Sequence, residues 1–185
     1  MRYLWIRNKA VPPGSRCALI ASVVVAVLFP AVAAAADAPV VAPADRLEAA
    51  VLDELNLVRL EHGLGQLRVS SSLTEAADHH SLAMVRAGYF AHESPDGSYF
   101  AKRIKWFYKP RSPRRRWTVG ENLIWSTDRL SARAAVGAWL ASPGHRENLL
   151  GPFREVGISA VRALAAPGVY GHRRVVVLTV DFGAR

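Results

Sequence analysis

Cysteine is nearly absent from this chain. Its 185 residues include a single one, Cys17, close to the N-terminus. A disulfide needs a second cysteine, so none can form within the chain. If the N-terminal segment is removed, no thiol nucleophile remains either. The chemistry of the remaining domain must therefore come from other side chains.

Acidic residues are absent from the first 36 positions, whereas four basic residues lie in the first 16. An apolar stretch from residue 17 onward ends in the run "AVAAAADAP". This order of charged, apolar and small residues is typical of a secretory signal peptide, so we predict that residues 1–36 are removed before Asp37. An uncleaved membrane anchor is the alternative, because the apolar stretch approaches the length of a bilayer span.

Positive charge remains in excess after the predicted leader is removed. The full chain carries 24 basic and 15 acidic residues, for a net charge of +9, and the loss of four basic residues lowers it to +5. A charge of this sign favours anionic partners outside the cell, but it does not indicate a fold.

The rest of the chain divides into a linker and one domain. Residues 37–44, "DAPVVAPA", are predicted to be a linker, and residues 45–185 the domain. A helix is predicted from Asp45, which can cap it, because apolar residues recur along one helical face. These residues are Leu47, Val51, Leu55 and Val58. A second helix is predicted to start with a capping box, Ser72 and Glu75, and to end at Gly88.

Two shorter helices and a pair of strands complete the prediction. The segment "YFAKRIKWF" is predicted to be a short helix, and Ser131 to open another that ends at Ala141, before the pair Pro143-Gly144. "EVGISAVRAL" and "RRVVVLTVDFG" are typical of strands joined by a turn at Pro167-Gly168. The second is apolar on both faces, so we expect it at the centre of a sheet. Helices followed by a strand pair indicate an α+β fold.

Five motifs occur in one order along the chain: "FAHESPDG", "GENLIW", "AWLASPGHRENLL", "EVGIS" and "VDFG". Together they resemble bacterial secreted CAP-domain (SCP-like extracellular) proteins, whose superfamily includes cysteine-rich secretory proteins, insect venom allergens and plant pathogenesis-related proteins. The resemblance covers Leu47 to Gly183. It implies an α-β-α sandwich with a mainly antiparallel central sheet and a groove on one side.

The resemblance also implies which residues line that groove. Animal and plant members hold two histidines and two glutamates there, and in some the histidine pair binds a divalent metal. His92, Glu121 and His145 match three of these positions, while Ser142 falls where the second glutamate would lie. We therefore expect these four residues and Asn122 in the groove, with His92 and His145 as ligands of at most a weakly bound divalent metal such as zinc. No other cofactor is predicted.

When the family resemblance is set aside, the chemistry of these residues allows two interpretations. Two imidazoles and one carboxylate are a plausible zinc set with an open position for water. Alternatively, each residue satisfies the backbone of a loop. Glu121 can accept N–H bonds in a loop before Leu123, and a buried carboxylate can fix the tautomer of His145. The sequence alone does not decide between a site and a scaffold.

Acidic residues are also absent from residues 102–116, where aromatic residues are interleaved with basic ones. One interpretation is a solvated loop anchored to the domain by its aromatic side chains. The other is a patch for an anionic surface such as a wall polymer or phospholipid headgroups. Nucleic acid is not expected, because an exported protein seldom meets it. The patch comprises Lys102, Arg103, Lys105, Lys109, Arg111, Arg114, Arg115 and Arg116.

These observations predict a secreted, extracellular protein that binds envelope, lipid-like or anionic ligands through its groove and basic loop. The alternative is a metal-assisted or acid-base hydrolase of peptide or cell-wall substrates that uses His92, Glu121 and His145. A membrane contact is expected if the leader is uncleaved. Whether the protein is an enzyme, which ligand it takes and how it assembles stay open at this point.

Overall fold

The computed structural model describes residues 39–112, 117–127 and 129–185. The predicted signal peptide and Arg114 to Arg116 lie outside the described residues. Residues from Ala38 to Arg185 form one compact unit. Within the described part of the chain, no helix is both long and apolar enough to cross a membrane. Among the described residues, the buried apolar side chains all lie between Ala44 and Phe182, so we expect the chain from residue 37 onward to fold on its own.

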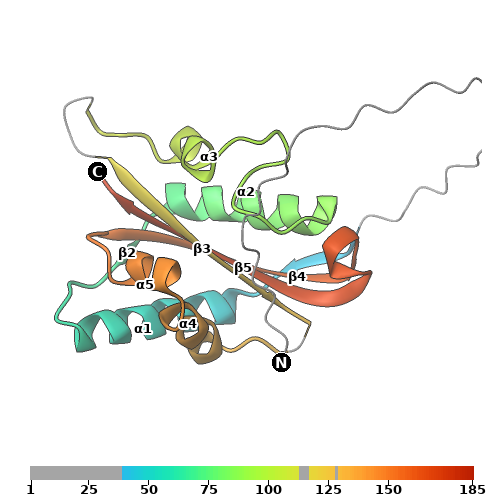
Figure 1. Ribbon diagram of the computed structural model, residues 1–185, viewed down its shortest axis with the longest axis horizontal. Coiled ribbons are helices and arrows are strands. Elements are labelled where there is room, and N and C mark those ends of the chain that lie inside the picture. The colour runs from blue at the N-terminus through green and yellow to red at the C-terminus, as the bar shows by residue number, and fades with distance from the viewer. Residues whose placement is uncertain (1–38, 113–116, 128) are drawn as a thin grey trace, which may run out of the picture. The chain divides into compact units, whose positions relative to one another are not determined.

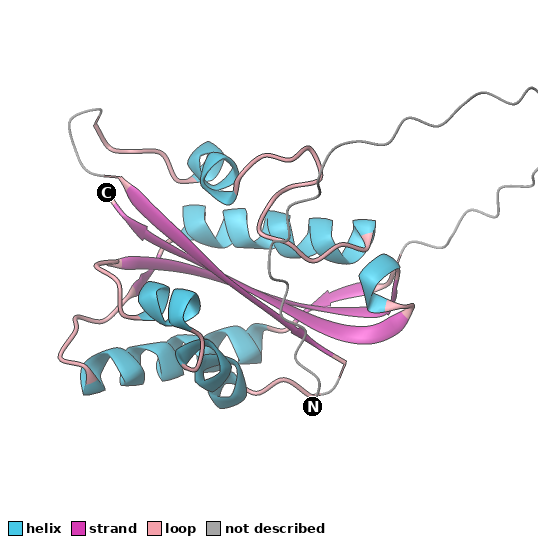
Figure 2. Cartoon of the chain, viewed as in Figure 1, coloured by secondary structure: helices cyan, strands magenta, loops and turns pink. Residues whose placement is uncertain are grey.

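The centre of the domain is a twisted sheet (Figures 1 and 2). Its order is β1 (Val41–Pro43), β4 (Glu155–Ala166), β5 (Arg173–Ala184) and β3 (Thr118–Ser126), and each neighbouring pair is antiparallel. A short strand, β2 (Arg68–Val69), pairs in parallel with β4. β5 lies between β4 and β3 and is buried on both faces, which confirms its predicted central position.

Helices cover both faces of this sheet (Figure 1). On one face lie α2 (Ser71–Ala87) and α3 (Phe100–Phe107), and on the other α1 (Asp45–Glu61), α4 (Ala132–Leu140) and α5 (Pro143–Leu149). The domain is therefore an α+β, three-layered α-β-α sandwich, as predicted.

The predicted stripe of α1 forms part of the main core. Leu47, Val51, Leu55 and Val58 are all buried and pack in one cluster with Trp139 of α4. Full burial of each aliphatic side chain contributes about 1.5–3 kcal/mol to folding. Ser131 caps α4 as predicted, because its hydroxyl accepts a hydrogen bond from Ala134 N at 3.2 Å.

The predicted caps of the first two helices do not form, although α1 begins at Asp45 as predicted. Asp45 is the first residue of α1 and does not cap it, since Ala44 precedes the helix. The capping box of Ser72 and Glu75 does not form either, because the residue that precedes α2 is Ser70, two positions before Ser72, and its side chain makes no cap. Ser70 N instead donates to Val156 O of β4 at 2.9 Å. Pairing with the sheet, and not local capping, therefore fixes where α2 begins.

Two segments predicted to be irregular are regular. Val41–Pro43, inside the predicted linker, pair with residues 161–163 of β4. α4 ends at Leu140, ahead of the pair Pro143-Gly144 as predicted, but the pair itself is helical, because Pro143 is the first residue of α5. Proline suits that position, since its missing N–H would have no partner in the first turn of a helix.

Candidate functional site

Strand β3 positions Glu121 at the centre of a buried polar cluster. The motif "GEN" was predicted to be a loop, and this prediction is wrong, because Gly120, Glu121 and Asn122 pair with β5. The backbone hydrogen bonds of this segment are therefore made across the sheet. The Glu121 side chain has no exposed surface.

Arg103 of α3 is the charge partner of Glu121. Its Nη2 contacts Glu121 Oε2, and its Nη1 donates to His92 O at 3.0 Å and to Ser94 Oγ at 3.3 Å. The prediction that Arg103 belongs to a surface patch is wrong, since the residue is only 4% exposed. Its guanidinium is directed inward because a buried carboxylate needs a cation and hydrogen-bond donors.

His92 completes this group at the surface. Its Nδ1 lies 2.8 Å from Glu121 Oε1, and its side chain is 41% exposed. Burial acts to raise the pKa of Glu121, but the hydrogen bond from His92 and the charge of Arg103 outweigh it, so this pKa lies below the ordinary value. Glu121 is therefore an ionised acceptor that holds the Nδ1–H tautomer of His92 and directs Nε2 away from itself.

His145 reaches the same place from the first turn of α5. Its ring centroid lies 6.3 Å from that of His92, and its Nδ1 lies 3.0 Å from Ser142 Oγ. Asn122 Nδ2 donates to His145 O at 3.1 Å, which ties α5 to β3. Burial and the nearby charge of His92 lower the pKa of His145, so its imidazole is neutral at pH 7.

The structure thus brings together the five residues predicted for the groove, although the groove itself stays a prediction. Asn148, which the sequence analysis missed, fastens them: its Nδ2 donates to Glu121 O at 3.0 Å and to Asn122 Oδ1 at 2.8 Å. The sequence feature that could have indicated Asn148 is its spacing of three residues from His145, which places both residues on the same side of a helix.

The described residues do not form a complete ligand set for a resident metal ion. Both oxygens of Glu121 are engaged, one by His92 and one by Arg103. Among the described residues, no group of three or more His, Cys, Asp or Glu side chains is placed to hold a metal. A metal bound between the two imidazoles would have two protein ligands, one fewer than catalytic zinc sites usually have.

Two further buried ionisable residues, Asp181 and His80, lie near the cluster, and the sequence did not predict Asp181. Asp181 is fully buried on β5 opposite Glu121, and neither of its carboxylate oxygens has a hydrogen-bond partner among the described residues. His80 of α2 is fully buried, with Nε2 2.9 Å from Ala91 O. Burial lowers its pKa to about 4. Asp181 is the one acid inside the apolar run "VVVLTVDFG", and this position could have indicated that it is buried.

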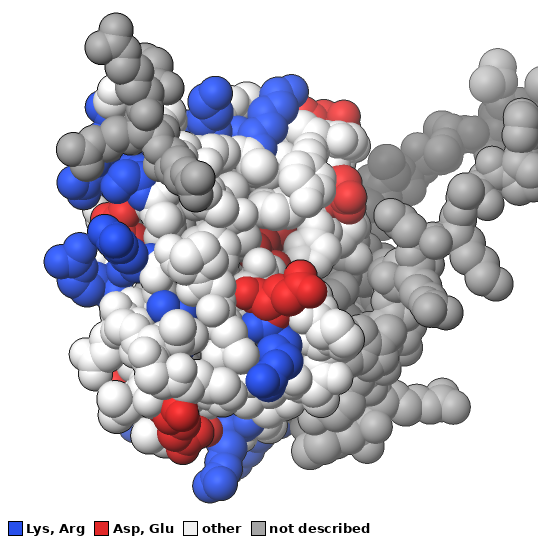
Figure 3. All heavy atoms as spheres, turned by 60° about the vertical axis from the view of Figure 1, so that its left-hand side comes forward, with Lys and Arg blue, Asp and Glu red and all other residues white. Residues whose placement is uncertain are grey.

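Basic residues gather at the end of the sheet where the chain terminates (Figure 3). Arg111 and Arg185 lie 3.8 and 3.7 Å from the Glu155 carboxylate, and Arg185 Nη1 donates to Lys109 O at 3.0 Å. We call this surface the basic end. It comprises the residues around Glu155, namely Arg68, Lys109, Arg111, Arg154 and Arg185. Lys102 and Lys105 of the predicted patch are exposed on α3.

The aromatic side chains of the basic segment divide into two kinds. Tyr108 is fully buried, and Trp117 Nε1 donates to its carbonyl oxygen at 2.8 Å, so these two anchor the segment as predicted. Trp106, by contrast, is 67% exposed. Packing in the core therefore does not account for an indole at that position.

An α-β-α sandwich that joins a strand glutamate, a loop histidine and a helix histidine is the class of domain that the five sequence motifs predicted. Residues 52–180 match the model of the CAP family, described as the cysteine-rich secretory protein family. This match covers well over half of the chain, and the chain belongs to that family.

Two relatives come from Bacillus subtilis (strain 168). The uncharacterized protein YkwD is 32% identical over 120 residues, which make up 63% of this chain and 43% of that protein. The uncharacterized membrane protein YlbC is 32% identical over 103 residues, 56% of this chain and 28% of that protein. The chain thus spans less than half the length of either relative.

Solved structures show the same fold. An outer surface protein from Borrelia burgdorferi superposes with a TM-score of 0.66 at 18% identity, covering 80% of this chain and 98% of that one. An extracellular protein of Bacillus anthracis str. Ames that contains an SCP domain superposes with a TM-score of 0.58 at 26% identity, covering 76% of this chain and 41% of that one. At 18% identity, the first likeness concerns the fold alone.

Proposed function

We propose that this chain is an exported CAP domain that binds an anionic polymer of the cell envelope through the basic end. One observation carries the proposal: the segments that meet at one end of the sheet carry five basic residues, of which only Arg111 and Arg185 pair with an acid, Glu155, among the described residues. The ion pairs that Glu155 makes with Arg111 and Arg185 span more than 3.5 Å and reach the surface, so they contribute little and leave the positive potential largely in place.

The sequence around the basic end supports the same proposal. Arg114, Arg115 and Arg116 follow Arg111 along the chain without an intervening acid. A concentration of one charge attracts polymers of the opposite charge, and this attraction is screened by salt over about 10 Å at 0.1 M ionic strength. A repeating anionic polymer can occupy several of these cations at once.

A binding titration tests the proposal. The chain from residue 37 onward is titrated with polyphosphate, as a probe of an anionic polymer, at about 50 mM and about 300 mM salt. We expect binding at the lower salt and at least about tenfold weaker binding at the higher. The triple variant Lys109→Glu, Arg111→Glu, Arg154→Glu should lose most of the affinity at low salt.

The matched control reverses the same number of charges elsewhere. Arg46, Arg86 and Arg133 are exposed on α1, α2 and α4. The variant Arg46→Glu, Arg86→Glu, Arg133→Glu has the same net charge as the test variant, so it should retain most of the affinity. Equal losses in the two variants would show that total charge, and not the basic end, determines binding.

The export part of the proposal rests on residues 1–36 and on the extracellular SCP-domain protein among the structural neighbours. Mass spectrometry of the protein from expressing cells should find an N-terminus near Asp37 in the fraction outside the membrane. An intact Met1 on membrane-bound protein would instead identify the segment as an anchor.

A second candidate function is acid-base hydrolysis of a peptide or cell-wall bond. The observation that favours it is the pairing of a half-exposed imidazole with a buried, ionised carboxylate, His92 with Glu121. In such a pair the carboxylate orients the ring, so that Nε2 is placed to take a proton from water. The neutral His145 ring lies 6.3 Å away, within reach of the same reacting group.

Incubation of the domain with purified peptidoglycan and a mixed peptide library tests this candidate. We expect His92→Ala to abolish the release of soluble products, and His62→Ala, which removes an exposed histidine after α1, to leave it unchanged. Release of no product by the unaltered domain, or an equal loss in both variants, would count against hydrolysis.

A further inference from the structure

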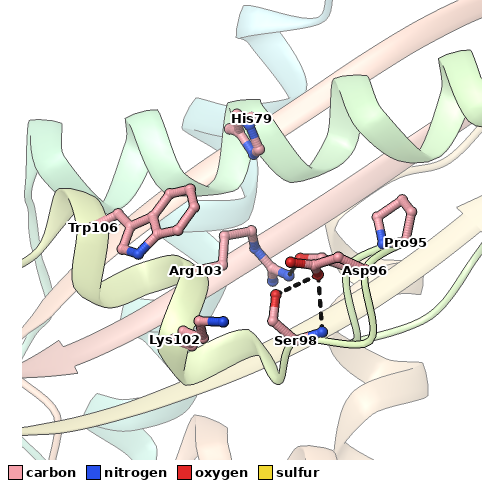
Figure 4. A pocket seen from close by; sticks show the side chains of 8 residues that line it. His79, Pro95, Asp96, Ser98, Lys102, Arg103 and Trp106 are labelled. Atoms are coloured by element: carbon pink, nitrogen blue, oxygen red, sulfur yellow. Dashed lines mark hydrogen bonds between the residues drawn. The ribbon is translucent and has the colours of Figure 1, made fainter.

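A separate cavity lies beside the His92–Glu121 cluster. It has a volume of about 260 Å³ and lies between the turn at residues 94–98 and helix α3 (Figure 4). His92, Glu121 and His145 are not among its lining residues, whereas Arg103 lines it and is shared with the cluster. The volume is slightly below the ~300 Å³ at which ordinary small-molecule sites begin, so the cavity suits one ring-sized group.

Trp106 forms one wall of this cavity, opposite Pro95 (Figure 4). The packing of α3 does not require it, since Ile104 and Tyr108 of the same segment are fully buried and anchor it to the core. Trp106 itself is 67% exposed, which leaves a large apolar ring face in contact with water. An indole in this setting offers a flat surface on which an apolar face of a ligand can stack.

Polar groups of both kinds line the same cavity. Asp96 is ionised, because hydrogen bonds from the hydroxyl and the backbone N–H of Ser98 hold its pKa below the ordinary value. Lys102 lines the cavity as well, and Arg103, which is 96% buried, has an Nε without a hydrogen-bond partner among the described residues. The cavity thus combines a hydrogen-bond acceptor, cationic donors and an aromatic face.

This combination selects between classes of ligand. An inorganic anion would meet the negative charge of Asp96, and a wholly apolar molecule would displace water from the charged groups of Lys102 and Asp96 without offering a hydrogen bond in return. Hydroxyl groups both donate and accept, so they can satisfy Asp96 and Lys102 together. A pyranose ring also has a C–H face that stacks on an indole.

We propose that this cavity is a saccharide-binding site, in which one sugar ring stacks on Trp106 and its hydroxyl groups bond to Asp96 and Lys102. This site is separate from the basic end. It would bind a neutral sugar unit, whereas the basic end would bind an anionic polymer. The proposal does not depend on hydrolysis, because none of these side chains is needed to act on the bound sugar.

Isothermal titration of the chain from residue 37 onward with N-acetylglucosamine trimer, and separately with maltotriose, tests the proposal. We expect at least one of them to bind. Trp106→Ala should weaken that binding by about tenfold, because aromatic stacking contributes up to about 1.5 kcal/mol. Asp96→Asn should also weaken it, since the amide replaces one acceptor by a donor. Unchanged circular dichroism of each variant shows that the fold is retained.

Tyr99→Ala is the matched control, because Tyr99 is an aromatic residue that is 58% exposed but does not line the cavity. It should bind the sugar within about twofold of the unaltered protein. The charge-reversal variant of the basic end should keep sugar binding, and Trp106→Ala should keep polyphosphate binding, so the two sites fail independently. The proposal would be overturned if neither sugar binds at about 10 mM, or if Tyr99→Ala weakens binding as much as Trp106→Ala does.

Discussion

Glu121 and Asp181 face each other across β3 and β5, and both are buried. Their carboxyl groups behave in opposite ways. The pKa of Glu121 lies below its ordinary value, because the hydrogen bond from His92 and the charge of Arg103 outweigh burial. Burial and the negative charge of Glu121 raise the pKa of Asp181 well above its ordinary value. Of the two carboxyl groups, Asp181 is therefore the one that keeps its proton to higher pH.

The first prediction concerns the proton on Asp181. The unfolded chain releases this proton near the ordinary pKa of 3.8, whereas the folded chain keeps it. The contribution of Asp181 to stability is therefore complete below pH 3.8 and is lost as the pH rises towards the folded pKa. Asp181→Asn keeps a neutral donor beside Glu121 and removes this loss. We expect its Tm at pH 7 to rise by a few degrees, about 3–5 °C, with no gain near pH 3.

Thermal unfolding of both proteins between pH 3 and pH 8 measures the effect. The two Tm curves should converge towards acid pH and separate towards neutral pH. A variant that is less stable than the unaltered protein at pH 7 would show that Asp181 is ionised in the folded domain.

The second prediction concerns the ion pair of Arg103 with Glu121. Glu121→Gln leaves the guanidinium buried without its charge partner, so we expect it to destabilise the domain by about 3–5 kcal/mol. The double variant Arg103→Met, Glu121→Gln removes both charges and should recover a large part of this loss. Urea unfolding of the single and double variants provides the comparison. A double variant at least as unstable as the single one would mean that Arg103 stabilises through contacts other than Glu121.

The sequence predicts the fold well because the apolar residues that recur with helical or strand periodicity are the ones buried in the core. The stripe from Leu47 to Val58 and the apolar run of β5 are buried as expected. Helix starts are predicted less well. Ser72 and Glu75 have the spacing of a capping box, but the bond from Ser70 N to Val156 O decides where α2 begins, and no local pattern contains that contact.

The candidate site was likewise predicted only in part. The order of the motifs indicated His92, Glu121 and His145, which lie together in the structure. Arg103 was missed because it stands in a run of surface cations, and its burial depends on a carboxylate 18 positions away. Glu121 was assigned to a loop because two adjacent polar residues inside a buried strand are unusual, and its side-chain partners, His92 and Arg103, come from a loop and from α3. Residues that act in pairs across the fold are thus hidden from a local pattern.

The third prediction concerns His80. Burial lowers its pKa from 6.5 to about 4, so the unfolded chain binds a proton between these values that the folded chain does not. Its contribution to stability is complete above pH 6.5 and is lost as the pH falls towards 4, by about 3 kcal/mol in all. His80→Gln keeps a donor for Ala91 O but does not titrate. Its free energy of unfolding should therefore fall less between pH 6.5 and 4, and parallel pH profiles would contradict the prediction.

The last prediction concerns a metal. Two imidazoles are competent zinc ligands, but Glu121 is engaged by Arg103 and His92, and Ser142 is a poor substitute for the missing second acid. Fewer anionic ligands give less charge compensation for a divalent ion, so we expect zinc to bind with at most micromolar affinity, roughly 8 kcal/mol. Binding should also be weaker at acid pH, because protonated imidazoles do not bind metal.

Calorimetric titration of the chain from residue 37 onward with zinc at pH 7.5 and at pH 5.5 tests this expectation. His92→Ala and His145→Ala should each abolish binding without a change in circular dichroism, whereas His79→Ala, which removes an exposed histidine of α2, should not. Zinc that stays bound in a one-to-one ratio after dialysis against a chelator would contradict weak binding. It would mean that Arg103 releases Glu121 to the metal, since no third ligand is otherwise at hand among the described residues. The hydrolase candidate would then be favoured over the binding function.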